Sequence, residues 1–255
     1  MMSNNHRLRI LFWNIRHGGG QRASRIVDQI LEWNPDIVAL AEFRGTAPST
    51  SIAKQLHHVG LLHQFTTVDT DNPSWNALLL ASRYKLTSFK VKGAPEPDLY
   101  WLLAHVQTQI PFHIGVVHVP WSIFLGRLEY YDALLNVAET WEFGPGVVIG
   151  DTNTGITGHD EETEDSEQYK DRFMYPFEAL GWRDMFRAFH PDVNAPTWYS
   201  PSNKGRRLDQ AFVNDELQTH VRSCDYDWGS VGEGGKLSDH AAILLDIRQS
   251  NHVED

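Results

Sequence analysis

The stretch GVVIGDTNTG, residues 146–155, begins as an apolar and β-branched run and then changes to polar side chains. A short run of this kind, bounded by turn residues, is typical of a buried strand. Asp151, Thr152 and Asn153 stand where that strand should end. Polar groups at the end of a buried strand need either water or a functional role. Polar residues at the ends of several strands would therefore indicate a shared site.

Polar residues flank most of the other apolar runs of the chain. They are Asn14 after LRILFW, Glu42 after DIVALA, His118 after FHIGVV, Asp209 within RRLDQAFV, and Asp239 with His240 before AAILLDI. A sheet exposes its strand ends at a shared rim, where residues that are distant in sequence can meet. We therefore expect these side chains to converge on one site.

The apolar runs predict a sheet-rich α/β protein. The expected strands are residues 8–13, 37–41, 77–82, 87–91, 102–107, 112–117, 146–149, 208–213 and 242–247. Apolar residues recur three and four apart in residues 21–33, 52–59 and 122–142, which predicts helices there. The Asn-Pro pair at 34–35 should end the first helix.

Length and charge limit the classes of protein to consider. A chain of 255 residues with 41% hydrophobic residues can fill one large core, so we expect a single domain over residues 1–255. Its 33 acidic and 22 basic residues give a net charge of −11, unlike a protein that spreads Lys and Arg over a nucleic-acid-binding face. Seven of the acids lie in residues 155–172, which predicts a solvated loop insertion. We expect this acidic loop to border the cleft and restrict which substrates enter.

The sequence carries no sign of export or membrane insertion. The apolar run near the N-terminus is too short for a signal peptide, and no window approaches the roughly 20 apolar residues that span a bilayer. The single cysteine, Cys224, cannot form an internal disulfide. These features favour a cytoplasmic protein without a membrane span, and nothing in the sequence requires a protein partner.

The residue types at the expected rim favour phosphoester hydrolysis. Oxygen donors such as Glu42, Asn14 and Asp239 suit Mg²⁺ or Mn²⁺, whereas the histidines lack the spacing of a zinc site. A divalent cation could neutralise a phosphoryl oxygen while Asp151 orients or deprotonates water. Two histidines, 118 and 240, could then donate hydrogen bonds to the phosphate.

The ordered set of motifs resembles the endonuclease/exonuclease/phosphatase superfamily, the deoxyribonuclease-I-like proteins. It is carried over nearly the whole chain by FWNIRHG, VALAEFR, NALLLASR, GVVHVPW, GVVIGDTNTG, RRLDQAFV and LSDHAAILLDI. Members of this superfamily hydrolyse phosphoesters in DNA, RNA, lipids and small phosphorylated molecules. The resemblance implies a four-layer αββα sandwich of two packed mixed sheets, with the site at one end.

The resemblance also implies roles for individual residues. Glu42 matches the metal-binding glutamate, Asn14 lies near ion and phosphate, and Asp239 lies beside the metal. Alone, these would be a solvated acid, a turn cap and a surface turn. Asp151 and Asn153 match the pair that positions the attacking water, although GDTNTG alone could be an ordinary turn.

The two histidines carry different implications. His240 matches the residue that contacts the scissile phosphate, and Asp209 the aspartate that fixes its tautomer and favours its protonated form. A salt bridge from Asp209 to Arg206 or Arg207 is the alternative. His118 places the chain in the histidine-containing branch. Asn76 should orient it, but related nucleases carry glutamate there, and an amide cannot favour a charged ring.

Substrate contacts follow less directly from the motifs. Arg44 and Arg16 lie near the catalytic motifs and, with Arg207, could bind phosphate, since arginine is a bidentate phosphate ligand. Trp121 and Trp198 could stack on a base or sugar, and packing at the rim is the alternative. Nucleic acid is the favoured substrate. A small-molecule or lipid phosphoester and a catalytically idle binding module stay open as alternatives.

Overall fold

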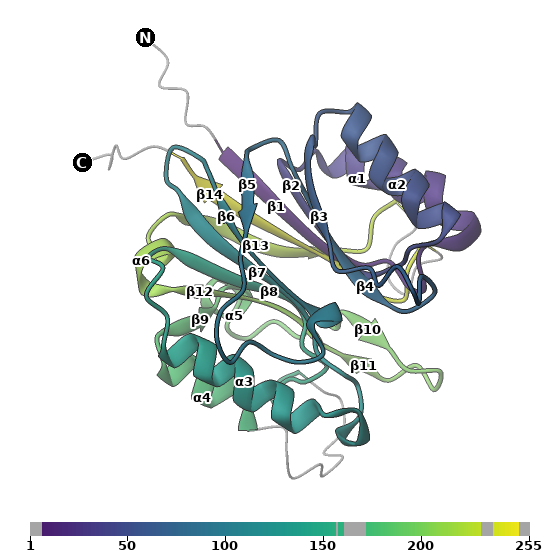
Figure 1. Cartoon of the computed structure of the whole chain (residues 1–255). Coiled ribbons are helices and arrows are strands. Elements are labelled where there is room, and N and C mark those ends of the chain that lie inside the picture. The colour runs from purple at the N-terminus through teal and green to yellow at the C-terminus, as the bar shows by residue number, and fades with distance from the viewer. Residues whose placement is uncertain (1–6, 157, 161–171, 231–236, 250–255) are drawn as a thin grey trace.

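The structure is a computed structural model that describes residues 7–156, 158–160, 172–230 and 237–249. Within these residues, two six-stranded sheets pack face to face, and helices cover the outer face of each sheet (Figure 1). The expected αββα sandwich is therefore confirmed. Most of the predicted acidic loop, residues 157 and 161–171, lies outside the described residues.

The first sheet contains the chain's beginning and its last described strand. Its strands are β1 (Arg7–Asn14), β2 (Ile37–Phe43), β3 (His63–Thr66), β4 (Ala77–Ser82), β13 (Val221–Asp227) and β14 (Ala242–Arg248). They lie in the order β13-β14-β1-β2-β4-β3. The β1–β2 pair is parallel and the other pairs are antiparallel, so the sheet is mixed.

The second sheet contains the middle of the chain. Its strands are β5 (Leu86–Ser88), β6 (Trp101–Val106), β7 (Phe112–His118), β8 (Gly146–Asp151), β9 (Trp182–Asp184) and β12 (Asp209–Asn214). Their order is β5-β6-β7-β8-β12-β9, with β7 and β8 parallel. A separate two-stranded ribbon joins β10 (Trp198–Tyr199) and β11 (Gly205–Arg206).

Helices pack on both outer faces. On the first sheet lie α1 (Ala23–Trp33) and α2 (Ala47–His58), and on the second lie α3 (Arg127–Glu139) and α4 (Met174–Ala179) (Figure 1). Shorter elements are η1 (Gly20–Arg22), η2 (Asp98–Tyr100), η3 (Ile123–Leu125), α5 (Met185–Phe189) and α6 (Asp215–Gln218). The layers follow from strand periodicity, since alternate residues of β1 face the other sheet and the helices.

Several predicted elements have different bounds in the structure. The expected helix 52–59 begins earlier, at Ala47, and of the expected strand 87–91 only residues 87 and 88 belong to β5, which ends at Ser88. The expected helix 122–142 begins later, at Arg127, because Gly126 is left-handed at φ 83° and separates it from a loop. Five strands among the described residues were not predicted: β9, β10 and β11 have only two or three residues, and the half-exposed, polar sequences of β3 and β13 lack an apolar run.

Strand register places three of the polar residues side by side. Asp151 ends β8, and it is paired with His118 on β7 and with Asp209 on β12. Alternation along β8 puts Asp151 on the same face as Val147 and Ile149, which pack between the sheets. The row therefore continues the apolar interior to the end of the sandwich, where the site begins.

A bulge in β2 brings in the glutamate from the first sheet. The β2–β4 register shifts between Leu40 and Phe43, and Glu42 is left-handed at φ 54°. Simple alternation would put Glu42 on the opposite face from the interior residues Ala39 and Ala41. Bulges re-aim side chains beside functional sites, and here the bulge lets Glu42 reach the Asn14 amide at 3.4 Å.

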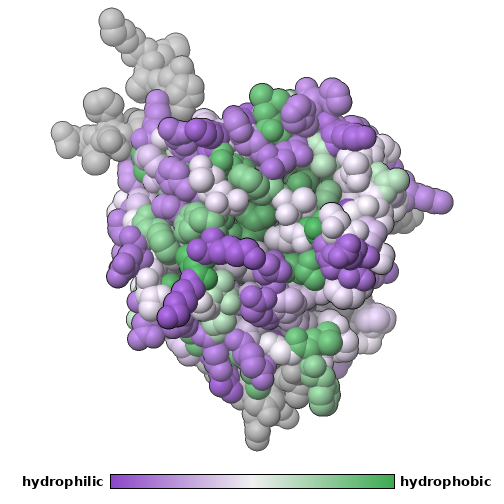
Figure 2. Space-filling model, viewed as in Figure 1, coloured by the Kyte–Doolittle hydropathy of each residue, from purple (hydrophilic) through white to green (hydrophobic). Residues whose placement is uncertain are grey.

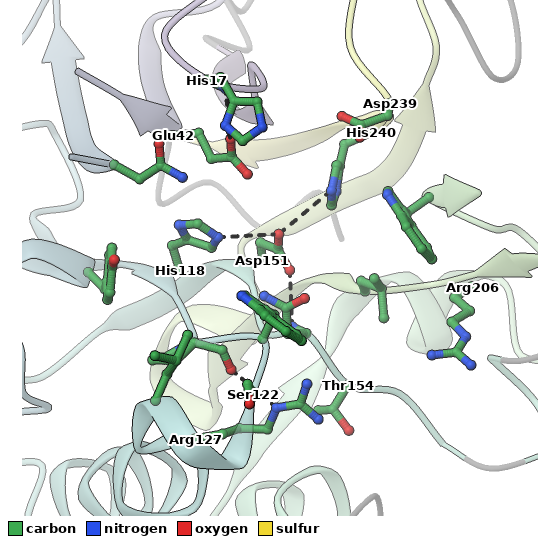
Figure 3. Close-up of a pocket in the computed structure, with 18 of the residues that line it drawn as sticks. His17, Glu42, His118, Ser122, Arg127, Asp151, Thr154, Arg206, Asp239 and His240 are labelled. Carbon is green, nitrogen blue, oxygen red and sulfur yellow. Dashed lines mark hydrogen bonds and ion pairs between the residues drawn. The ribbon is translucent and has the colours of Figure 1, made fainter. Parts of the chain in front are cut away.

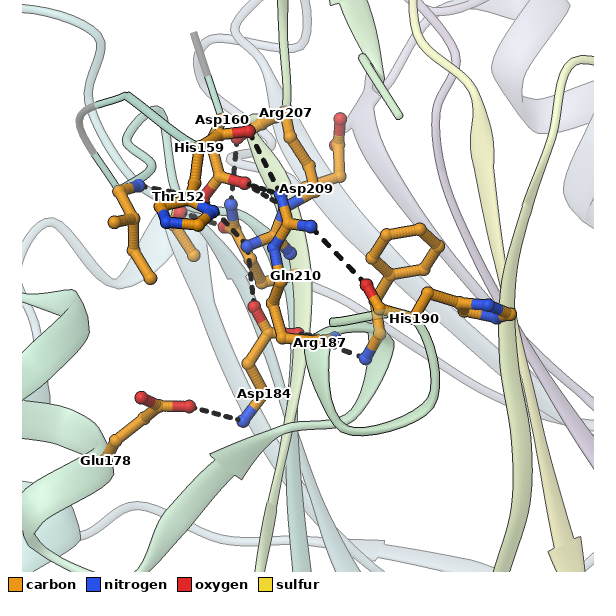
Figure 4. Close-up of polar contacts among 12 residues, drawn as sticks. Thr152, His159, Asp160, Glu178, Asp184, Arg187, His190, Arg207, Asp209 and Gln210 are labelled. Carbon is orange, nitrogen blue, oxygen red and sulfur yellow. Dashed lines mark hydrogen bonds and ion pairs between the residues drawn. The ribbon is translucent and has the colours of Figure 1, made fainter. Parts of the chain in front are cut away.

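A buried group of ion pairs lies behind the start of β12 (Figure 4). Arg207 is 1% exposed, and its Nε and Nη2 donate to the two Asp160 oxygens at 2.7 and 2.8 Å. Its Nη2 also lies 2.7 Å from Asp184 Oδ2, and Arg187 pairs with the same Asp160. The expectation that Arg207 binds substrate is wrong, because its side chain is buried and its charge is paired with Asp160 and Asp184 inside the protein.

Replacing Asp160 with Asn should destabilise the fold strongly. The change leaves Arg207 and Arg187 short of a counter-charge in a buried site, which costs about 3–5 kcal/mol. Asp132→Asn is the matched control, because it breaks the exposed Asp132–Arg172 pair at 3.0 Å and should cost under about 1 kcal/mol. Urea unfolding measures both, and equal losses in the two variants would contradict the account.

Candidate active site

The polar strand ends of both sheets line one cavity. It has a volume of about 900 Å³, and Figure 3 shows the labelled side chains around it. The predicted residues that line it are Glu42, Asn76, His118, Trp121, Asp151, Asn153, Trp198, Asp239 and His240. The expected convergence of residues from across the chain is thus observed, because strand register carries them to the same end of the sandwich.

Asp151 lies at the centre of this group, between two imidazole rings (Figure 3). Its Oδ2 is 3.8 Å from His118 Nε2 and 3.8 Å from His240 Nε2. The same oxygen accepts a hydrogen bond of 3.0 Å from the Asn14 amide. Gly150 makes this packing feasible, since a Cβ there would lie 2.1 Å from the Val117 carbonyl oxygen.

Burial controls the charge of Asp151. The side chain is buried, and this burial, together with the neighbouring Asp209 carboxylate, raises the pKa of Asp151 to about 6. The imidazoles of His240 and His118 and the Asn14 amide act in the opposite direction. A carboxyl group with a pKa close to neutrality is well matched to accepting a proton from water.

His240 and Asp209 form the pair that the sequence predicted. His240 Nδ1 lies 2.9 Å from Asp209 Oδ2, and both residues are buried. Burial alone would lower the pKa of His240, but the Asp209 and Asp151 carboxylates outweigh it and raise that pKa to about 10. The ring is therefore protonated at neutral pH, with Nε2 available as a donor toward the cavity.

Glu42 is held by the glycine-rich turn that follows β1. His17 donates its backbone N–H to Glu42 Oε2 at 2.7 Å, and its Nδ1 lies 3.0 Å from the same oxygen. Burial alone would raise the pKa of Glu42, but the imidazoles of His118, His17 and His240 outweigh it and lower that pKa. The carboxylate thus stays charged beside the cavity.

Asn153 joins the loop after β8 to the end of β7. It is left-handed at φ 52°, a conformation that asparagine tolerates, and its backbone N–H donates to Asp151 Oδ1 at 3.0 Å. Its side-chain amide donates to the Val119 carbonyl at 2.7 Å. The residue therefore fixes the position of Asp151 relative to His118.

The expected contact between Asn76 and His118 is not found. Asn76 Oδ1 instead accepts a hydrogen bond of 2.8 Å from Arg44 Nε, and His118 Nδ1 is buried without a hydrogen-bond partner. Arg44 also contacts the ring of His17 at 2.9 Å. The side chain of Arg44 is thus held by the amide of Asn76 and the imidazole of His17. Asn76 therefore orients Arg44 and not His118.

The donor set suits a divalent cation. Among the described residues, the carboxylates of Asp151 and Asp209 and the imidazole of His240 have atoms within 4.8 Å of one another, but the protonated His240 ring has no lone pair for an ion, so only the carboxylates count as donors. Asp209 Oδ1 is buried with no hydrogen-bond partner. Oxygen-rich sites of this type fit hard cations, and Glu42 and Asp239 add two further carboxylates to the cavity wall.

The other two predicted ligands differ in exposure. Asn14 is buried, and its Oδ1 accepts from the Arg16 backbone N–H at 3.0 Å, so its amide N–H₂ faces the carboxylates. Asp239 has a side chain 36% exposed and lies 3.8 Å from Arg16 Nε. Asn14 therefore arranges the carboxylates, while Asp239 keeps an accessible charge.

Several residues that line the cavity were not predicted as site residues. They include His17, Tyr100, Phe124, Leu125 and Arg127. The sequence does contain a signal for His17, because this residue precedes the three glycines 18–20, which indicate a turn. In the structure, residues 16–20 all have a positive φ. Phe124 and Leu125 were missed because the apolar periodicity of this segment continues into α3, so both were predicted to lie within a helix.

The comparison with known families decides the assignment. The profile of the Endonuclease/Exonuclease/phosphatase family matches residues 11–240. The chain belongs to this family. The match spans every strand end described above, from Asn14 to His240.

Solved structures share the fold of this family member at low sequence identity. A 3'-5' exonuclease (NExo) from Neisseria meningitidis has a TM-score of 0.76 at 18% identity, covering 94% of this chain and 100% of that one. An AP endonuclease from Archaeoglobus fulgidus has a TM-score of 0.78 at 19% identity, covering 94% and 99%. A variant of the 3' phosphatase NExo from Neisseria, bound to product DNA hairpin, has a TM-score of 0.75 at 18% identity, covering 94% and 99%.

Two further searches are negative. A search of curated protein sequences finds no match to this chain. In the described part of the chain, none of the helices has the length and apolar character needed to cross a bilayer.

Asp209→Asn should lower the pKa of His240. The amide keeps the shape of the side chain but removes the charge that opposes the burial of His240, so that pKa should fall from about 10 toward its ordinary value of about 6.5. Imidazole chemical shifts in a pH titration measure it. A ring that still titrates near pH 10 in the variant would contradict the assigned cause.

Proposed function

We propose that the protein is a divalent-metal-dependent phosphodiesterase that hydrolyses nucleic acid by in-line attack of water. The observation that carries this proposal is the buried Asp151 carboxylate between two imidazoles, one of them paired with Asp209. Family membership supports phosphoester hydrolysis, and the structural neighbours named above include a DNA-bound protein. A cytoplasmic location is part of the proposal, supported by the single, buried cysteine.

Mg²⁺, with Mn²⁺ as a substitute, is the proposed cofactor. Glu42 and Asp239 would hold it, because both are carboxylates on the cavity wall and Glu42 has a lowered pKa. A bound ion of this kind neutralises negative charge on a phosphoryl oxygen. Asn14 would keep Glu42 and Asp151 in place through its amide.

The remaining residues perform the proton chemistry. Asp151 orients the attacking water and accepts its proton, which suits a carboxylate whose pKa is raised to about 6. Protonated His240 donates from Nε2 to a phosphate oxygen, while Asp209 holds its Nδ1 side. His118 assists as a donor from the other side of Asp151, and Asn153 keeps the loop in register.

Substrate contacts in this proposal come from the cavity rim. Trp121 and Trp198 line the cavity and offer ring faces to a base or sugar. Arg16 is exposed beside Asp239, and Arg44 contacts two residues that line the cavity, Asn76 and His17. Both can interact with phosphate oxygens at the edge of the site.

Removal of the central groups should abolish turnover without unfolding the protein. Asp151→Asn and His240→Ala should each lower kcat about 10²–10³-fold, the usual effect of losing one electrostatic group. Cleavage of a labelled oligonucleotide measures turnover, and circular dichroism checks the fold. Near-normal turnover by Asp151→Asn would reject its role as the water-directing base.

Metal dependence and substrate class are tested together. A panel of single-stranded DNA, RNA, a 3'-phosphorylated oligonucleotide, a nucleotide and a lipid phosphoester is assayed with Mg²⁺, with Mn²⁺ and with chelator. We expect cleavage of the nucleic acids with either ion and none with chelator, with Glu42→Gln requiring more metal for half-maximal rate. Chelator-resistant cleavage would overturn the metal-dependent part of the proposal.

A further inference from the structure

The loop between β7 and α3 exposes large apolar side chains beside the cavity. Trp121 is 69% exposed, Phe124 92% and Leu125 55%, and all three line the cavity. Figure 1 places this loop at the end of α3, and Figure 2, in the same view, shows apolar surface at that place. Large apolar side chains gathered beside a cavity mark a binding region.

Hydrogen bonds fix this loop, residues 119–126, relative to the reaction centre. We call it the rim loop. Val119 donates its N–H to the Asp151 carbonyl at 2.8 Å, and the Asn153 side chain donates to the Val119 carbonyl at 2.7 Å. At the other end of the loop, Arg127 Nε donates to the Pro120 carbonyl at 3.1 Å. A ring carried by this loop therefore keeps a set position relative to the phosphate-cleaving groups.

Aromatic rings also stand on other sides of the cavity. Trp198 is half-buried and forms an isolated β-bridge with His240. The Tyr100 ring packs edge-on against His118, with centroids 5.4 Å apart. A flat group that enters beside the phosphate site thus meets aromatic surface from the rim loop and from elements elsewhere in the chain.

The charge of the protein determines which ligand suits such a rim. Binding along a duplex depends on neutralising many phosphates, and the chain carries a net charge of −11. Base stacking on aromatic side chains is the alternative source of affinity, and it requires bases whose faces are not already stacked in a duplex. A lipid surface would also contact exposed apolar side chains, but the negative charge opposes approach to anionic membranes.

We infer that Trp121 and Phe124 form a base-stacking rim that makes the protein bind unpaired nucleotides in preference to paired ones. The inference rests on the proposed function, because the rim is placed to hold a strand whose phosphate is cleaved at Asp151. The ligand class is a single-stranded or frayed nucleic-acid end. Leu125 extends the apolar surface next to the stacked base.

Binding measured apart from cleavage tests the inference. Fluorescence anisotropy, with chelator present, compares a labelled single strand, the same strand with abasic residues, and a blunt hairpin. The wild type should bind the base-bearing strand roughly 5- to 150-fold more tightly than the abasic strand, the range expected for one stacked base. The Trp121→Ala/Phe124→Ala double variant should lose most of this preference, measured as the ratio of its affinities for the two strands. Tyr175→Ala, which removes a 51% exposed aromatic side chain outside the cavity, is the control and should keep it.

Three outcomes would overturn the inference. They are equal wild-type affinity for the base-bearing and abasic strands, tighter binding of the hairpin, and an unchanged preference in the double variant. Co-sedimentation with phosphatidylcholine vesicles that is lost in the double variant, without any base preference, would assign the rim to lipid instead. Cleavage with Mg²⁺ is scored separately, so a base preference without cleavage would reject the proposed phosphodiesterase and keep the rim.

Discussion

Burial of a carboxylate next to a second carboxylate is the constraint on which this site depends. Asp151 and Asp209 are paired across neighbouring strands, and both are buried, so their charges repel in a low-dielectric interior. The two imidazoles that flank Asp151 offset this repulsion. Burial and the Asp209 carboxylate raise the pKa of Asp151, and the carboxylates of Asp209 and Asp151 raise that of His240, which suits one residue as a base and the other as a donor.

Departures from regular strand geometry make this arrangement feasible. A flat β2 would direct Glu42 away from the interior, and the bulge with its left-handed residue corrects this. Next to β12, the Arg207–Asp160 ion pairs fix the start of this strand, from which Asp209 projects. The Tyr226 hydroxyl contacts Arg207 and donates to the Asp209 carbonyl at 2.6 Å, which links that network to the site.

Much of the fold and site could be predicted from the sequence, because β-strand alternation is local and polar residues at strand ends are visible in it. The convergence of Asp151, His240 and Glu42 followed from this pattern together with the family resemblance. Contacts set by tertiary neighbours could not be predicted. Arg207 was expected to bind phosphate, and only the folded chain brings Asp160 and Asp184 to it. The partner of Asn76 was missed for the same reason, since its amide meets an arginine from a different segment.

A crystal structure with Mn²⁺ and a nucleoside monophosphate is the most direct test of the central claim, that one hollow holds both the cation and the phosphate. Anomalous scattering locates the manganese independently of the protein. We expect a manganese peak bound to the carboxylate of Glu42, with the phosphate within hydrogen-bonding distance of the Nε2 atoms of His118 and His240. Manganese and phosphate bound away from this cavity, with Asp151 contacting neither, would contradict it.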